Sequence, residues 1–122
     1  MPSPILVDRA GTVATITLNR PDALNTLDFT MMDALVAATA DVAADDTLHV
    51  VVLQAAGKHF MAGGDLRTFA GELHKPGPQR DADFRAMIGR LHAAIEHLHR
   101  MPHPVVARVQ GAALGGGVGL VC

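Results

Sequence analysis

The sequence predicts an α/β fold in which pairs of strands are followed by a helix. Short runs of alternating or β-branched apolar residues lie between longer amphipathic segments, and glycine-rich loops join them. The chain has 122 residues, and 49% of them are hydrophobic. That length and composition suffice for one buried core and argue against a disordered chain.

Two strands are predicted at the start, at 5–8 and 12–18. In the second run Ala14, Ile16 and Leu18 alternate with more polar neighbours, which is typical of a strand with one buried face. A turn with the sequence Asn-Arg-Pro-Asp ends this run, because proline lacks the donor that a strand ladder needs.

A helix and a third strand follow. The helix is predicted over 28–44 with Asp28 as its N-cap, because apolar residues recur along one helical face. The run 48–53 is short, β-branched and leucine-rich, so it is interpreted as a buried strand. Met31, Met32, Met61, Met87 and Met101 are interpreted as core residues.

The second half of the chain repeats this alternation. Asp65 is expected to cap a short helix that ends near residue 70, and 71–81 is expected to be a polar loop. The clearest helix is predicted over 83–101, and a strand is predicted over 105–109. Five glycines lie within 111–119, and a helix is expected to open at about Leu120.

Both glycine-rich stretches stand between a predicted strand and a predicted helix. The first N–H groups of a helix have no partner inside it, and the helix dipole adds partial positive charge there. Glycine lets a ligand approach such N–H groups because it has no Cβ. Two such loops facing one point would offer two donors to an oxyanion. From spacing alone, a tight turn or a close-packing contact stays open as the simpler alternative.

Neither stretch matches a nucleotide-binding signature. A dinucleotide fingerprint that started at Gly115 would need a glycine where the chain has Leu120. A phosphate-binding P-loop that started at Gly111 would need a lysine where the chain has Gly117.

Three ordered blocks resemble the crotonase family, also called the enoyl-CoA hydratase/isomerase superfamily. Residues 16–25 read ITLNRPDALN and are similar to the family's strand followed by N-R-P-x-x-x-N. Residues 60–66 read FMAGGDL and are similar to F-x-A-G-x-D-L. Residues 104–117 read PVVARVQGAALGGG and are similar to P-V-x-A-x-V-x-G-x-x-x-G-G-G. The resemblance implies a crotonase-like (ClpP/crotonase) superhelix of ββα units.

The resemblance also implies where an acyl-CoA thioester would bind. The backbone N–H groups of Gly64 and Gly116 match the two amides that form the oxyanion hole in the family, so they are the catalytic groups we expect. Fixed donors of this kind stabilise an enolate-like oxygen by about 3–4 kcal/mol each. The implied substrate and CoA contacts are Asp22, Ala23, Leu24, Ala62, Gly64, Asp65, Leu66 and Gly116. Asp65 is also expected to be a helix cap, and Asn25 is expected to hold a turn.

One position departs from the pattern of the family's hydratases. They carry a glutamate three residues after the middle glycine, where this chain has Gly119. Glycine neither gives nor takes a proton, so hydration by two glutamates is in doubt, and isomerisation or other chemistry stays open. The second acid or base and the C-terminal trimerisation helices would lie beyond Cys122. We therefore expect residues 1–122 to be one partial crotonase-like domain, its N-terminal half.

Two functions remain as alternatives. The first is an acyl-CoA-binding enzyme of the enoyl-CoA hydratase/isomerase type, a lyase or isomerase of fatty-acid metabolism, with coenzyme A present only as part of the thioester substrate. Complete family members of this type would form homo-oligomers, either trimers or hexamers. The second is a catalytically inert truncated fragment that acts only as a binding or structural piece.

Charge and composition disfavour other partners. The formal net charge is −2, which argues against nucleic acid or an anionic membrane. No apolar run reaches the ~18 residues of a membrane span, no signal peptide is visible, and the single cysteine favours the cytoplasm. Solvated charge in or beside the loop is the favoured interpretation of the carboxylates Glu72, Asp81 and Asp83. Surface or interface positions are favoured over metal ligation for the histidines His92, His97, His99 and His103.

Overall fold

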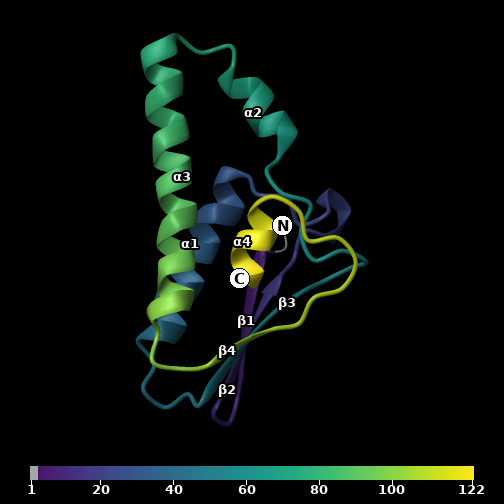
Figure 1. Cartoon of the computed structure of the whole chain (residues 1–122), viewed down its shortest axis with the longest axis vertical. Coiled ribbons are helices and arrows are strands. Elements are labelled where there is room, and N and C mark those ends of the chain that lie inside the picture. Colours follow the sequence, from purple (N-terminus) through teal and green to yellow (C-terminus); the bar gives the residue numbers. More distant parts are fainter. Residues whose placement is uncertain (1–2) are drawn as a thin grey trace.

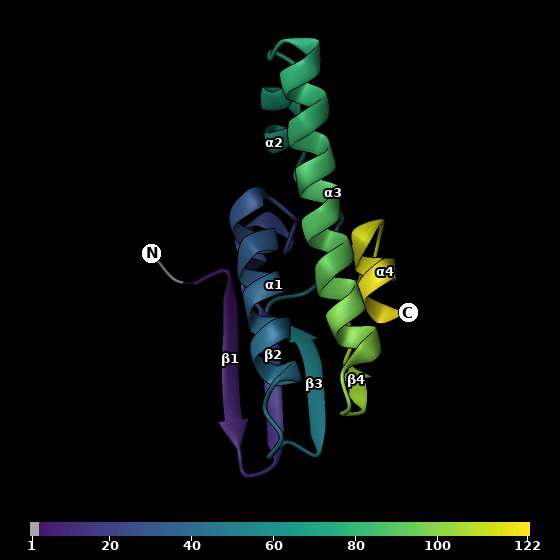
Figure 2. The same ribbon diagram turned by 90° about the vertical axis from the view of Figure 1, so that its left-hand side faces the viewer.

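A computed structural model describes residues 3–122 as a mixed α/β fold, shown in Figure 1 and Figure 2. One sheet of four strands has the order β1-β2-β3-β4. Strands β1 and β2 are antiparallel, whereas β2, β3 and β4 run parallel to one another. The strands are β1 (Ile5–Ala10), β2 (Val13–Leu18), β3 (Val50–Ala55) and β4 (Val105–Ala107). The predicted α/β class is confirmed, and the predicted strands differ from these mainly at their ends.

The alternation in β2 places its apolar residues in the core. Ala14, Ile16 and Leu18 are fully buried, and Ile16 lies opposite Leu53 in the parallel pair of β2 with β3. The sheet is covered on one face by two helices, α1 (Phe29–Ala43) and α3 (Gly77–Arg100), which pack against each other (Figure 2). All five methionines expected in the core are buried.

The prediction of a polar loop over 71–81 is correct only for residues 73–76. The short helix α2 (Leu66–Glu72) ends later than expected, and α3 begins at Gly77 rather than at Asp83. Pro76 is the N-cap of α3, and Pro78 lies in the first turn. A proline is tolerated there because N–H groups of the first turn have no partner within the helix. Helix α2 and the start of α3 lie side by side beyond the end of the sheet (Figure 1 and Figure 2).

The last helix also begins earlier than the sequence predicts. Helix α4 spans Gly116–Val121 and therefore contains glycines that disfavour a helix by propensity. Packing explains them, because a Cβ on Gly117 would lie 2.9 Å from the backbone oxygen of Met61. The close approach of two backbones at this point overrides helix propensity.

The connections place three segments at one edge of the sheet. Residues 19–28 follow β2, residues 56–65 follow β3, and residues 108–115 follow β4. These three strands are parallel, so their carboxyl ends lie along the same edge, where open α/β sheets bind ligands. Across residues 3–122, no helix is both long enough and apolar enough to traverse a lipid bilayer.

Candidate functional site

A groove of about 640 Å³ runs along the edge where the three segments meet. It is lined by all seven residues of the first two blocks for which a CoA contact was expected, and it also contains Arg20, Arg67 and Phe69. Gly116 does not line this groove. It lines a smaller adjoining cavity of about 180 Å³, together with Leu27, Met32, Gly64, Phe69, Met87, Ile88 and Leu91.

Backbone pairing holds the segment after β2 against the segment after β3. The N–H of Ala62 donates to the oxygen of Leu24 at 3.1 Å, and the N–H of Leu27 donates to the oxygen of Gly63 at 2.9 Å. The N–H of Asp65 then donates to the oxygen of Leu27 at 2.9 Å. Leu27 and Gly64 therefore form a short parallel β-bridge. The bonds made by the oxygen of Gly63 and the N–H of Asp65 fix the two peptide groups that flank Gly64.

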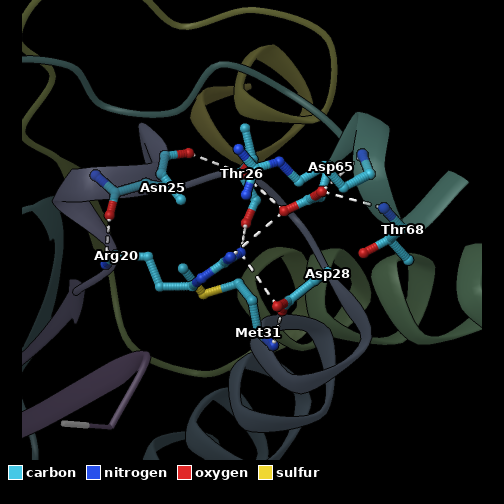
Figure 3. A network of polar contacts seen from close by, with 9 residues as sticks. Arg20, Asn25, Thr26, Asp28, Met31, Asp65 and Thr68 are labelled. Carbon is cyan, nitrogen blue, oxygen red and sulfur yellow. Dashed lines mark hydrogen bonds and ion pairs between the residues drawn. The ribbon is translucent and has the colours of Figure 1, made fainter. Parts of the chain in front are cut away.

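One guanidinium joins the N-termini of two helices (Figure 3). Arg20 Nη1 donates to the backbone oxygen of Thr26 at 2.6 Å and lies 3.3 Å from Asp28 Oδ2. Arg20 Nη2 lies 3.4 Å from Asp65 Oδ2. Asp28 and Asp65 are the N-caps of α1 and α2, so Arg20 ties both caps to the edge of the groove. The expected cap role of both aspartates is confirmed.

Asp65 is held as a carboxylate. Its Oδ1 accepts the N–H groups of Arg67 at 2.9 Å and Thr68 at 3.2 Å (Figure 3). Burial alone would raise the pKa of Asp65, but the N–H of Thr68, the Arg20 guanidinium and the N–H of Arg67 outweigh it. The pKa of Asp65 consequently lies below its usual value of 3.8. Asp65 is charged at neutral pH and is occupied by structural contacts.

Asn25 holds the turn that precedes this network, as expected. Its φ of 54° is in the left-handed region, which asparagine tolerates better than most residues. The side chain is fully buried, accepts the N–H of Arg20 at 2.7 Å and donates to the oxygens of Ala56 and His59 at 3.0 and 3.1 Å. These bonds join the turn after β2 to the loop after β3.

The second glycine loop packs directly on the first. The N–H of Met61 donates to the oxygen of Ala112 at 3.1 Å, and the N–H of Leu114 donates to the oxygen of Met61 at 3.0 Å. Gly115 has a φ of 54°, and a Cβ on it would lie 3.6 Å from the Cα of Gly63. Gly63 of the first loop and Gly115 of the second loop are therefore neighbours. The two loops lie side by side, as the expectation of two donor loops at one point requires.

Gly64 and Gly116 both line the small cavity, and the N–H group of each is unused among the described contacts. Among the contacts of residues 3–122, neither N–H donates to another protein atom. The cavity that both residues line is otherwise surrounded by apolar side chains. A carbonyl oxygen placed between two such donors would be polarised in surroundings of low dielectric constant, where hydrogen bonds are strengthened.

Glu72 is the clearest departure from expectation among the carboxylates. It was expected to be a solvated loop charge, but it lies at the end of α2 and is only 5% exposed. Its Oε1 accepts a bond from Lys75 at 3.0 Å, whereas its buried Oε2 has no partner among the described residues. Lys75 also binds Asp83 at 2.6 Å, and the bonds to Asp83 and then Glu72 raise the pKa of Lys75 above 10.5. Asp81 lies in α3 rather than in the expected loop, whereas Asp83 lies in α3 in agreement with the helix predicted over 83–101.

The histidines are divided between surface and interior. His92 and His99 are exposed, as expected. His103 is buried, with Nε2 3.0 Å from the oxygen of Val42, and His97 Nδ1 lies 2.9 Å from the hydroxyl of Thr39. The expectation of a surface or interface position is therefore wrong for His103, which is buried within the chain. Residues 3–122 contain no cluster of three or more metal-ligating side chains.

Two residues of this site were missed by sequence reasoning. Arg20 stood inside the first block but had been given no role, because its contact with Asp65 joins segments that lie far apart in the sequence. Phe69 lines both the groove and the cavity. Its position four residues after the cap Asp65 was the available signal, since residues four apart lie on the same face of a helix.

The fold and the paired glycine loops define a crotonase-type α/β protein. The enoyl-CoA hydratase/isomerase family model matches residues 13–122, and the chain belongs to this family. It is 37% identical over 106 residues to the probable enoyl-CoA hydratase echA12 of Mycobacterium bovis, a match that covers 87% of this chain and 37% of that protein. It is 39% identical over 113 residues to a probable enoyl-CoA hydratase of Rhizobium meliloti, with 93% of this chain and 40% of that protein covered.

A solved structure agrees with these relatives. The crystal structure of an enoyl-CoA hydratase from Mycobacterium smegmatis superposes with a TM-score of 0.84 at 36% identity. The superposition covers 96% of this chain and 44% of that chain. The chain spans about two fifths of the length of the curated relatives named above.

Proposed function

We propose that the chain belongs to an acyl-CoA enzyme of the enoyl-CoA hydratase/isomerase type, in which the N–H groups of Gly64 and Gly116 bind the thioester oxygen. The observation that carries this proposal is that two glycines whose N–H groups have no protein acceptor among the described residues line one apolar cavity. Family membership supports it independently. When the α-carbon of a thioester loses a proton or a nucleophile adds to its β-carbon, negative charge develops on that oxygen, and donors fixed in advance stabilise it.

The groove supports the coenzyme A part of the proposal. Its volume of about 640 Å³ falls within the usual range of ligand sites, ~300–1,000 Å³. It meets the small cavity at Gly64, which lines both spaces. A thioester that lay along the groove would therefore bring its carbonyl to the amides and its acyl chain into the cavity.

The proposal assigns binding and polarisation of the thioester to these residues, and it does not assign the proton transfer. Among residues 3–122 no carboxylate lines the small cavity, and Asp65 in the groove is occupied by Arg20 and the cap of α2. Gly119 supplies no acid or base at the position where the family's hydratases carry a glutamate. Isomerisation through a single acid or base fits these residues better than hydration by two glutamates.

The experiment removes one donor without removing the backbone around it. Gly116 is the first residue of α4, a position that proline favours. A Cβ there would lie 2.8 Å from Cδ1 of Leu27, the flexible end of a side chain that must move slightly, and 3.7 Å from Cδ2 of Leu91, an ordinary contact. Gly116→Pro deletes the N–H, and Gly116→Ala is the matched control that adds a Cβ but keeps the N–H. We expect Gly116→Pro to lower kcat for a short enoyl-CoA by about 10²–10³-fold and Gly116→Ala to lower it only slightly.

Calorimetry separates the enzyme from the inert alternative. Acyl-CoA should bind more tightly than an S-alkyl-CoA thioether of equal length, because only the thioester has an oxygen for the two amides. Gly116→Pro should reduce that difference, because it removes one of the two donors. Binding without turnover of any 2-enoyl- or 3-enoyl-CoA would favour the inert binding piece, and no binding at millimolar ligand would refute the proposal.

A further inference from the structure

A chain of hydrogen bonds leads from the Arg20 guanidinium to the peptide group that carries the N–H of Gly64. Arg20 Nη1 donates to the backbone oxygen of Thr26 at 2.6 Å (Figure 3). This oxygen belongs to the same peptide group as the N–H of Leu27, which donates to the oxygen of Gly63 at 2.9 Å. The oxygen of Gly63 in turn belongs to the same peptide group as the N–H of Gly64. A cation is therefore connected through two peptide groups to one of the two amides of the candidate site.

Each bond of this chain strengthens the next one. A peptide group is conjugated, so a donor at its oxygen draws electrons from its nitrogen and makes its N–H a stronger donor. Such cooperative strengthening amounts to about 10–30% per bond. The charge at the start of the chain is permanent, because an arginine side chain stays protonated in proteins. The N–H of Gly64 has no protein acceptor among residues 3–122, so the added donor strength is left for a ligand.

The same guanidinium holds both segments of the bridge that Leu27 and Gly64 form. On one segment, Arg20 binds the oxygen of Thr26, the residue before the bridge. On the other segment, Arg20 Nη2 lies 3.4 Å from Oδ2 of Asp65, the residue after the bridge. The Arg20 side chain is only 22% exposed, and its planar fork fixes two directions at once, which a lysine ammonium does not. The direction of the Gly64 N–H is thereby restrained.

Building on the proposed function, we propose that Arg20 is a positioning residue of the thioester site, which orients and polarises the N–H of Gly64 through two peptide groups. Arg20 acts on the thioester oxygen without touching it. The hydrogen bonds of the chain end at Gly64 and do not include Gly116, so the effect concerns one of the two donors. Removal of the guanidinium should therefore weaken the bond from Gly64 to the carbonyl oxygen and leave the bond from Gly116 in place.

The test is the infrared stretching frequency of the carbonyl in a bound saturated acyl-CoA, labelled with a heavy isotope at the carbonyl carbon. Hydrogen bonds to a carbonyl oxygen lower this frequency, so the parent should lower it relative to the free thioester. Arg20→Met should reduce this lowering, and Arg20→Lys, which keeps a cationic donor, should reduce it less. A donor worth about 10²–10³-fold in kcat that loses about 10–30% of its strength predicts a fall of kcat by about two- to eightfold in Arg20→Met.

The matched control is Arg67→Met, which removes a cation from the same groove. In the network of Arg20, Arg67 takes part only through its backbone N–H, which donates to Asp65 and is kept by methionine. Arg67→Met should leave the frequency of the bound carbonyl at the value of the parent. An equal change in Arg67→Met and Arg20→Met would show that the charge of the groove is responsible, and it would overturn the proposal.

The same spectra separate the proposal from two simpler roles of Arg20. A residue that only stabilises the fold, or that only contacts the ligand, would leave the frequency of the bound carbonyl unchanged in Arg20→Met, and this result would overturn the proposal while leaving the proposed function intact. If Arg20→Met fails to fold, Arg20→Gln decides, because it is neutral and should also raise the frequency above that of the parent. If the parent binds a thioester without lowering its frequency, or binds none, the proposed function fails, and this proposal fails with it.

Discussion

Replacement of Arg20 by methionine tests how the edge of the groove is held together. Methionine keeps an unbranched stem and removes the guanidinium. The bond to the oxygen of Thr26, at 2.6 Å from a charged donor, is of a kind worth about 1.5–3 kcal/mol. The contacts with Asp28 and Asp65 are longer, at 3.3 and 3.4 Å, and partly exposed, so they add about 0.5 kcal/mol each. We expect Arg20→Met to lower the free energy of unfolding by about 3 kcal/mol at neutral pH.

The loss should depend on pH because Asp65 takes part in it. The pKa of Asp65 is lowered in the folded protein, so its ionisation favours folding above the unfolded value, near 3.8. This contribution disappears as the pH falls through the lower folded value. Arg20→Met removes one cause of the lowering, so the folded pKa of Asp65 should rise. The difference in stability between parent and variant should be largest above pH 5 and shrink below pH 4.

The assay is urea unfolding of the parent and the variant at pH 7 and at pH 3, with the m-value checked for constancy. Arg100→Met is the matched control, because Arg100 is 77% exposed and its one ion pair is with Glu96 on the same helix. It should change the free energy of unfolding by less than about 0.5 kcal/mol. Equal stabilities of parent and Arg20→Met, or a difference that does not change between the two pH values, would refute this account of the network.

Three further outcomes are expected. Gly64→Ala should lower kcat, because its Cβ collides with the Phe69 ring, and Gly64→Ala/Phe69→Ala should recover part of the loss in the same assay. Asn25→Asp should lower the free energy of unfolding by about 2–4 kcal/mol in urea melts, since it puts a carboxylate against two backbone oxygens in a buried site. The pKa of Asp45 lies below 3.8 because of the hydroxyl and N–H of Thr47 and a bond from Arg9, so Thr47→Val should raise it in an NMR titration, and an unchanged value would contradict that cause.

The sequence predicted best those features in which burial makes apolar residues recur at a regular spacing. Ala14, Ile16 and Leu18 were assigned to one face of a strand by alternation, and all three are fully buried. Asp28 and Asp65 were assigned as caps by their place before an apolar run, and both accept backbone N–H groups. These features depend on neighbours within a few residues, so a local pattern suffices to predict them.

The sequence was least informative where distant segments decide the outcome. The run from Gly77 to Asp81 is interpreted as a loop when Pro78 and the preceding Pro76 are considered locally, but it becomes the start of α3, whose N-terminal part packs beside α2. Glu72 has the composition of a surface charge, and only the position of Lys75 and α3 shows that it is buried. Three-dimensional packing overrides local propensity in each case.

The same distinction separates the two parts of the candidate site. Its proposed donors are backbone N–H groups, which every residue except proline carries. The sequence therefore indicates them only indirectly, through glycines whose missing side chains leave room for close contacts. Gly117 against Met61 is such a position. The cavity beyond the donors is shaped instead by Phe69, Met87 and Leu91, which lie between or outside the recognisable blocks. Under the proposed function, chains that share all three blocks would share the two glycine amides, whereas the substrate that fits would be decided largely by residues that lie between the blocks.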